Sequence, residues 1–174
     1  MTMLAYHNDP QIKEKYLARV RAHALADEII QGKYWENGKG CAVGCTIHGS
    51  DHFQYETEIG IPWQIAKIED SIFEALPFDK AKLWPEQFLS SINIGADLSL
   101  ISPKFVVWIL VDKTDGVIQF ANQQGKEAIK KIADLYESRI NGEEPTESQW
   151  KEATTMAARA TDAARATWAA EAAW

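Results

Sequence analysis

The chain has 174 residues, of which 46% are apolar and 25% are charged, and this balance excludes intrinsic disorder and a small disulfide framework. Its 18 basic and 25 acidic residues give a net charge of −7, and no segment concentrates Lys and Arg as binding to a phosphate backbone requires. We therefore expect neither nucleic acid nor a membrane as a partner. No signal peptide is recognisable and the two cysteines suggest reduced thiols, so we expect a cytoplasmic protein.

The first sixty residues predict one long helix and two short ones. Asp9-Pro10 is an N-cap followed by a proline at the first helical position, and the helix should run to about residue 30. Asn37-Gly38 indicates a tight turn. We expect a short helix within residues 40–49 and a second within 50–60, where Gly60 suits a left-handed C-terminal position.

Residues 61–76 predict an amphipathic helix, because their large apolar residues recur every three or four positions. We expect this stripe to face the core, and Pro77 to end the helix. The stripe consists of Ile61, Ile65, Ile68, Ile72 and Leu76.

The second half of the chain is also mainly helical. A helix is expected within 85–94, and Ser102-Pro103 gives a further start signal before the apolar run Phe105–Val111. We expect this run to be a helix with Trp108 in the core. A short hairpin near 105–120 is the alternative, because the periodicity of so short an apolar run does not distinguish a buried helix from a strand.

The C-terminal part predicts two more helices. One should occupy 117–141, and Thr146-Glu147-Ser148-Gln149 is a capping box for an Ala-rich terminal helix over 146–174. The expected fold is therefore all-α, with residues 1–174 forming a single helical domain, an irregular bundle of six to seven helices.

Several segments together resemble a family of uncharacterised helical proteins from bacteria and their phages. They are GKGCAVGC, YETEIGIP with IEDSIFEALP, WPEQFL with GADLSL, and the Ala-rich end after EEPTESQW. The last 35 or so residues are loosely similar in composition to Ala-rich immunity-type proteins. The resemblance implies an all-helical fold and brings no activity, cofactor or catalytic residue.

Four good metal ligands, Cys41, Cys45, His48 and His52, lie within twelve residues. On one continuous helix the outer two would lie roughly 16 Å apart, since each residue adds about 1.5 Å, so the four could not converge on one ion. A break in the helix at Gly49 could bring His52 back toward the other three ligands. We expect the two cysteines to be buried in a helix of small residues, with no cofactor. A zinc site is the alternative.

Two groups of residues could carry out acid–base chemistry, and each also has a simpler structural interpretation. Cys41 or Cys45 could be a nucleophile with His48 as its base, but nearby acids would raise the thiol pKa. His23 and Asp27, four residues apart, could form an acid–base pair, but an ordinary surface pair on a helix explains them as well. We expect no catalytic residues.

Five acidic residues could be imagined as a two-metal cluster, yet no Glu-x-x-His motif accompanies them. These residues are Glu56, Glu58, Glu69, Asp70 and Glu74.

The seven tryptophans are many for this length. Trp150, Trp168 and Trp174 lie on the Ala-rich terminal helix, where aromatic side chains indicate an interface. We expect a non-enzymatic protein of a bacterium or its mobile elements that acts through a protein partner or as a homo-oligomer. A zinc- or thiol-dependent protein using Cys41, Cys45, His48 and His52 is the alternative.

Overall fold

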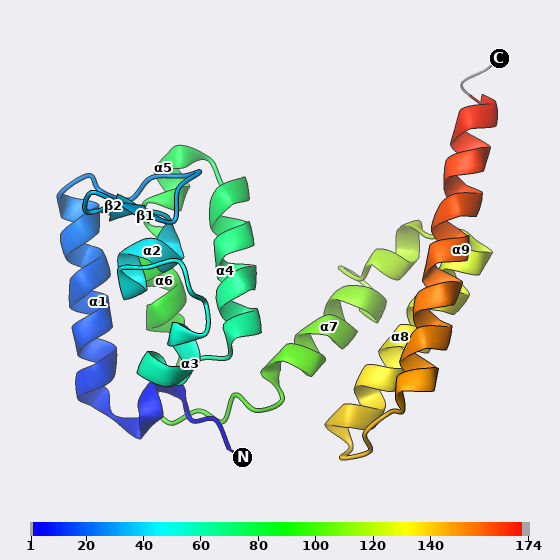
Figure 1. Cartoon of the computed structure of the whole chain (residues 1–174), viewed down its shortest axis with the longest axis horizontal. Coiled ribbons are helices and arrows are strands. Elements are labelled where there is room, and N and C mark those ends of the chain that lie inside the picture. The colour runs from blue at the N-terminus through cyan, green and yellow to red at the C-terminus, as the bar shows by residue number, and fades with distance from the viewer. Residues whose placement is uncertain (1, 172–174) are drawn as a thin grey trace. The chain divides into compact units, whose positions relative to one another are not determined.

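A computed structural model describes residues 2–171; for residues 164–171 it describes the backbone alone. The contacts divide the chain into two compact units, residues 1–99 and 100–174, shown in Figure 1. Helices dominate both units, which confirms the all-α fold class. The sequence predicts a single domain. That the two units unfold together, as one domain would, stays a prediction.

Unit 1 is built from helices and one short hairpin. Its helical elements are η1 (Ala5–Asn8), α1 (Pro10–Leu25), α2 (Ala42–Ile47), α3 (Gln54–Ile59), α4 (Trp63–Ala75), α5 (Phe78–Ala81) and α6 (Trp84–Ser91). Strands β1 (Trp35–Glu36) and β2 (Lys39–Gly40) form the hairpin. Asn37 and Gly38 both have positive φ, as the two-residue turn of such a hairpin requires.

Helix α2 lies in the middle of unit 1 and is contacted by α1, α4 and α6 (Figure 1). Every residue of α2 is buried. Cys41 caps its N-terminus, with Sγ accepting a hydrogen bond from the Gly44 N–H at 3.5 Å, and His48 ends it in the left-handed conformation. The short helix predicted here is therefore present. Its small residues allow the surrounding helices to approach it closely.

Helix α4 is where predicted, but the face it buries is different. Its buried residues are Ala66, Glu69 and Phe73, whereas Ile68 is half-buried and Ile72 is exposed. Ile61 is buried, and Ile65 and Leu76 are partly buried against the core. The expectation that the whole stripe faces the core is therefore wrong at Ile72, and Ile68 is not one of the residues packed against the core. The buried face is offset by one position along the helix, and it carries an acidic residue.

Unit 2 consists of three α-helices and one short 3₁₀ helix. They are α7 (Ile101–Val111), η2 (Val117–Phe120), α8 (Gln123–Ile140) and α9 (Glu147–Glu171). The apolar run Phe105–Val111 is helical, as expected, and no hairpin forms near 105–120. Helix α8 packs against both α7 and α9.

The capping box predicted before α9 is present. The Gln149 side-chain oxygen accepts from the Thr146 N–H at 2.8 Å, and the Thr146 hydroxyl accepts from the Gln149 N–H at 3.3 Å. These reciprocal bonds fix the start of the terminal helix.

Candidate functional site

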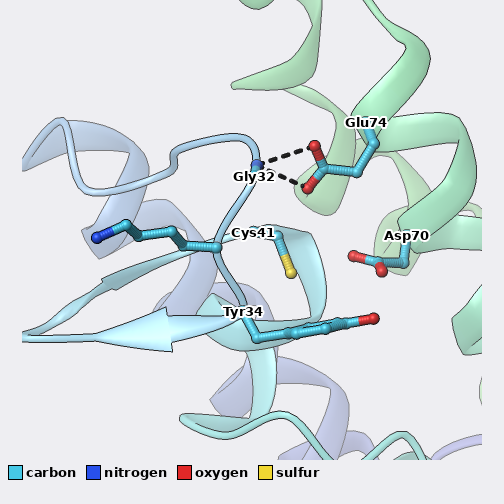
Figure 2. A pocket seen from close by; sticks show the side chains of 6 residues that line it. Gly32, Tyr34, Cys41, Asp70 and Glu74 are labelled. Carbon is cyan, nitrogen blue, oxygen red and sulfur yellow. Dashed lines mark hydrogen bonds between the residues drawn. The ribbon is translucent and has the colours of Figure 1, made fainter.

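A cavity of about 230 Å³ lies in unit 1, beside the N-terminus of α2 (Figure 2). Three of its lining side chains can bind a metal ion: Cys41, Asp70 and Glu74. The remaining lining residues are Gly32, Lys33 and Tyr34, which form the loop immediately before β1.

Local structure positions each of the three ligating side chains. Cys41 is the N-cap of α2, so its sulfur is held at the helix end. Asp70 and Glu74 are four residues apart on α4 and therefore share one side of that helix. Both Glu74 oxygens accept from the Gly32 N–H, at 3.0 and 2.9 Å, which ties the loop to α4.

The three ligand atoms all lie within 4.8 Å of one another. Figure 2 shows the Cys41 sulfur and the Asp70 carboxylate facing each other, with the Glu74 carboxylate turned toward Gly32. Cys41 is 1% exposed, and the Asp70 side chain is 14% exposed. The site is therefore deep at the cysteine and opens to solvent at Glu74, which is exposed.

Asp70 lies among several polar groups. The Cys41 thiol and the Tyr34 hydroxyl are its hydrogen-bonding neighbours, and its Oδ2 lies 3.8 Å from His52 Nε2. That His52 nitrogen is buried without a hydrogen-bond partner. Such an atom costs free energy unless something pairs with it.

Both thiols are protonated at neutral pH. Burial raises the pKa of Cys41, and the adjacent Asp70 carboxylate raises it further. Burial likewise raises the pKa of Cys45 to about 12, although a hydrogen bond with Gly40 opposes this. Neither environment activates a nucleophile, which needs a lowered thiol pKa.

The four residues of the alternative zinc site, Cys41, Cys45, His48 and His52, do not converge. Cys45 donates its thiol proton to the Gly40 carbonyl at 3.3 Å, away from the cavity. His48 stacks on Trp35, with ring centroids 4.5 Å apart. His52 lies against Tyr34 and Asp70. Cys41 is thus the one member of that set among the three ligands that meet at the cavity.

The sequence indicates Asp70 and Glu74 only as members of an acidic cluster. Their spacing of four residues on a helix places them on one side of it. Nothing local to that helix indicates that Cys41, some thirty residues earlier, lies opposite them.

The predicted pairing of His23 with Asp27 is not formed. His23 Nδ1 lies 2.6 Å from Glu28 Oε2, while Asp27 forms an ion pair with Lys82. Asp27 has positive φ just after the end of α1, which turns it away from the helix side that His23 occupies.

Unit 2 carries a second candidate surface, on α7 and η2. Helix α7 is apolar apart from Ser102 and Lys104, and none of its residues is buried. Trp108, expected in the core, is 45% exposed, so that expectation is wrong. Phe120 in η2 is 87% exposed.

Of the three tryptophans expected at an interface, the structure describes the side chain of Trp150 alone. Trp150 is half-buried and packs edge-to-face on Tyr136 of α8, with ring centroids 5.0 Å apart. It therefore holds α9 to α8. The side chain of Trp168, and all of Trp174, lie outside the described residues.

Within the described residues, no helix is both long and apolar enough to span a membrane. Comparison with protein-family models, with curated proteins and with solved structures finds no match to this chain.

Proposed function

We propose that this chain is a non-enzymatic interaction protein, and that it associates with a second copy of itself through the surface formed by α7 and η2. The observation that carries the proposal is an apolar helix without a buried residue. A helix that is apolar on all sides is normally enclosed by protein. Helix α8 covers one side of α7 and leaves the rest to be covered by a partner.

The composition of unit 2 supports this proposal. Among the described side chains of residues 100–163, Leu135 is the one large side chain that is buried. The other buried residues there are small: Gly116, Ala128, Ala133, Ala153 and Ala160. Small residues bury little apolar area, so this unit gains little stability from its own packing.

The uncovered area is large enough for a weak dimer. A full aromatic side chain provides about 150–250 Å², so Trp108 and Phe120 together leave roughly 250 Å² exposed. Leu100, Ile101, Ile109 and Val117 are also exposed and extend this area. A standard interface buries about 800 Å² on each partner, so we expect association in the micromolar range.

A second copy fits this surface better than a charged partner. Lys104 is the one charged residue of α7, so two copies can meet there without bringing a row of like charges together. Ile101, Trp108 and Ile109 lie seven and eight positions apart and therefore share one side of the helix. A two-fold pair would place that side against its own equivalent.

Sedimentation velocity over a concentration series tests the proposal with the full chain. We expect a concentration-dependent dimer for the wild-type protein. Phe120→Glu places a charge on a side chain that is 87% exposed, so it should leave the fold intact and weaken association at least tenfold. Leu25→Glu is the matched control, because Leu25 is 90% exposed on unit 1.

Two results would contradict this function. A wild-type chain that stays monomeric at tens of micromolar would remove the dimer. A dimer weakened equally by both substitutions would place the interface elsewhere.

A further inference from the structure

We propose that Cys41, Asp70 and Glu74 form a binding site for a divalent transition-metal ion, and that zinc is the ion that fits best. This site is independent of the α7–η2 surface, since all three residues belong to unit 1. It also differs from the zinc site that the sequence offers as an alternative, because Cys41 is the one residue common to both.

The donor chemistry selects the metal. One thiolate sulfur with two carboxylates is a mixed set that zinc accepts, with bonds of about 2.3 Å to sulfur and about 2.0–2.2 Å to oxygen. Magnesium and calcium take oxygen ligands, and monovalent copper prefers sulfur ligands throughout. Three protein ligands leave a fourth zinc position for water.

The geometry requires a small adjustment. Ligand atoms around a tetrahedral zinc ion lie roughly 3.5 Å apart, given bonds of about 2.0–2.3 Å. The three atoms here lie within 4.8 Å of one another, so shifts of about 1 Å bring them into place. A cavity of about 230 Å³ has room for the ion and several waters of about 30 Å³ each.

Contacts between the ligands already bring them together. The Asp70 carboxylate is the hydrogen-bonding neighbour of the nearly fully buried Cys41 thiol at the edge of the cavity, so a metal ion would take the place of the thiol proton between them. Each Glu74 oxygen contacts the Gly32 N–H, so one oxygen can keep that bond while the other binds metal. Supporting hydrogen bonds of this kind orient metal ligands.

Apart from His52, which lies 3.8 Å from Asp70, no basic side chain among the described residues is paired with the acids of this site. Within the described part of the chain, the ion pairs of Lys and Arg do not involve Asp70 or Glu74. Lys33 lines the cavity, but its ammonium group pairs with Glu36. A divalent ion would supply the positive charge, and the proton of the Cys41 thiol would pass to the buffer on binding.

His52 acts as a positioning residue rather than a ligand. Its Nε2 is 3.8 Å from Asp70 Oδ2, yet it does not belong to the group whose atoms lie within 4.8 Å of one another. A small approach would let its ring N–H donate to the Asp70 carboxylate and fix that ligand's orientation.

Metal titration of the full chain, prepared without an affinity tag, tests the proposal. Zinc is added in competition with a chromophoric chelator, and cobalt(II) is added separately because thiolate–cobalt bonds absorb in the near ultraviolet. We expect one equivalent of either metal and a thiolate band. Cys41→Ser should abolish the band and weaken zinc binding at least tenfold, and Glu74→Gln, at an exposed position, should weaken it similarly.

Matched variants separate this site from others. Cys45→Ser removes the other thiol, and Glu14→Gln removes an exposed acid of α1. His48→Asn removes a candidate ligand of the alternative Cys/His site. All three variants should bind metal as the wild-type chain does. Circular dichroism establishes that each variant is folded. The proposal is overturned if the wild-type chain takes up no metal at micromolar concentration. It is equally overturned if binding is lost in His48→Asn but kept in Glu74→Gln.

Discussion

At the scale of single residues, Glu69 is an acidic side chain on the buried face of a helix. It is fully buried on α4, where the buried Tyr55 hydroxyl is its hydrogen-bonding neighbour. Burial raises the pKa of Glu69 to about 8, although the hydrogen bond with Tyr55 opposes this. Hydrophobic periodicity does not predict such a residue, because it assigns acidic side chains to the exposed face.

A second residue-scale feature is a histidine pair on the surface of unit 1. His23 Nε2 and His48 Nε2 lie 2.9 Å apart, and Glu28 contacts the other nitrogen of His23. One proton between the two Nε2 atoms gives a hydrogen bond, whereas two would place like charges in contact. Burial lowers the pKa of His48, Arg19 and His23 lower it further, and Glu28 and Glu58 partly oppose them.

This pair should make stability depend on pH. Because the folded-state pKa of His48 is lowered, the unfolded chain binds more protons, and stability is lost as the pH falls from about 6.5, the ordinary histidine value. His48 is partly exposed, so we expect less than about 1 kcal/mol.

Urea unfolding of the wild-type chain and His48→Asn, between pH 7.5 and 5.5, measures this effect. Asn tolerates the left-handed backbone at position 48 and does not titrate, so the variant should lose less stability on acidification. Parallel pH profiles for the two proteins would refute the role of His48.

At the scale of elements, helix α2 depends on two glycines. A Cβ at Gly44 would lie 1.5 Å from the Tyr34 carbonyl oxygen, and one at Gly40 would lie 2.0 Å from the same atom. The motif GKGCAVGC thus allows the chain before β1 to pack directly on the start of α2. The same contact places Tyr34 beside Cys41 at the cavity.

Gly44→Ala should therefore destabilise unit 1 severely. The added methyl meets backbone, which has no rotamer to change, so we expect a loss of about 3 kcal/mol or more. Gly49→Ala is the control, because its Cβ would meet the flexible Gln54 side chain at 3.2 Å. Thermal unfolding followed by circular dichroism compares them, and equal melting temperatures would show that α2 can shift to accommodate the methyl.

The elements that the sequence predicts well are those determined by local chemistry. Asp9 accepts from the Gln11 N–H, Gly60 is left-handed, and Thr146 and Gln149 form their capping box. Each of these features involves residues a few positions apart. The buried face of α4 could not be predicted in this way, because the packing of α2, α3 and α6 against α4 decides which side is covered.

The candidate metal site has the same origin in long-range packing. The sequence around Cys41 indicates a candidate ligand, but Asp70 and Glu74 meet it only because α4 packs against α2. His48, the histidine closest to Cys41 in sequence, stacks on Trp35 instead. Spacing along the chain predicts a metal site when its ligands share one loop, and here they come from separate elements.

At the scale of the whole molecule, the two units differ in how they are stabilised. The core of buried large side chains lies entirely within residues 5–98 and includes Tyr6, Tyr16, Tyr55 and Phe73. Unit 2 has Leu135 and small residues in the corresponding role within its described side chains. Its stability should therefore depend on the partner that covers α7, whereas unit 1 should not need one.

This difference predicts how the full chain unfolds. Calorimetry should show two transitions, and the one belonging to residues 100–174 should move to higher temperature as protein concentration rises, because association stabilises that unit by mass action. A fragment of residues 1–99 should fold alone and unfold with an enthalpy near 60–80 kcal/mol, the usual value for about 100 residues. A single transition for the full chain, together with an unfolded fragment, would instead establish the one cooperative domain that the sequence predicts.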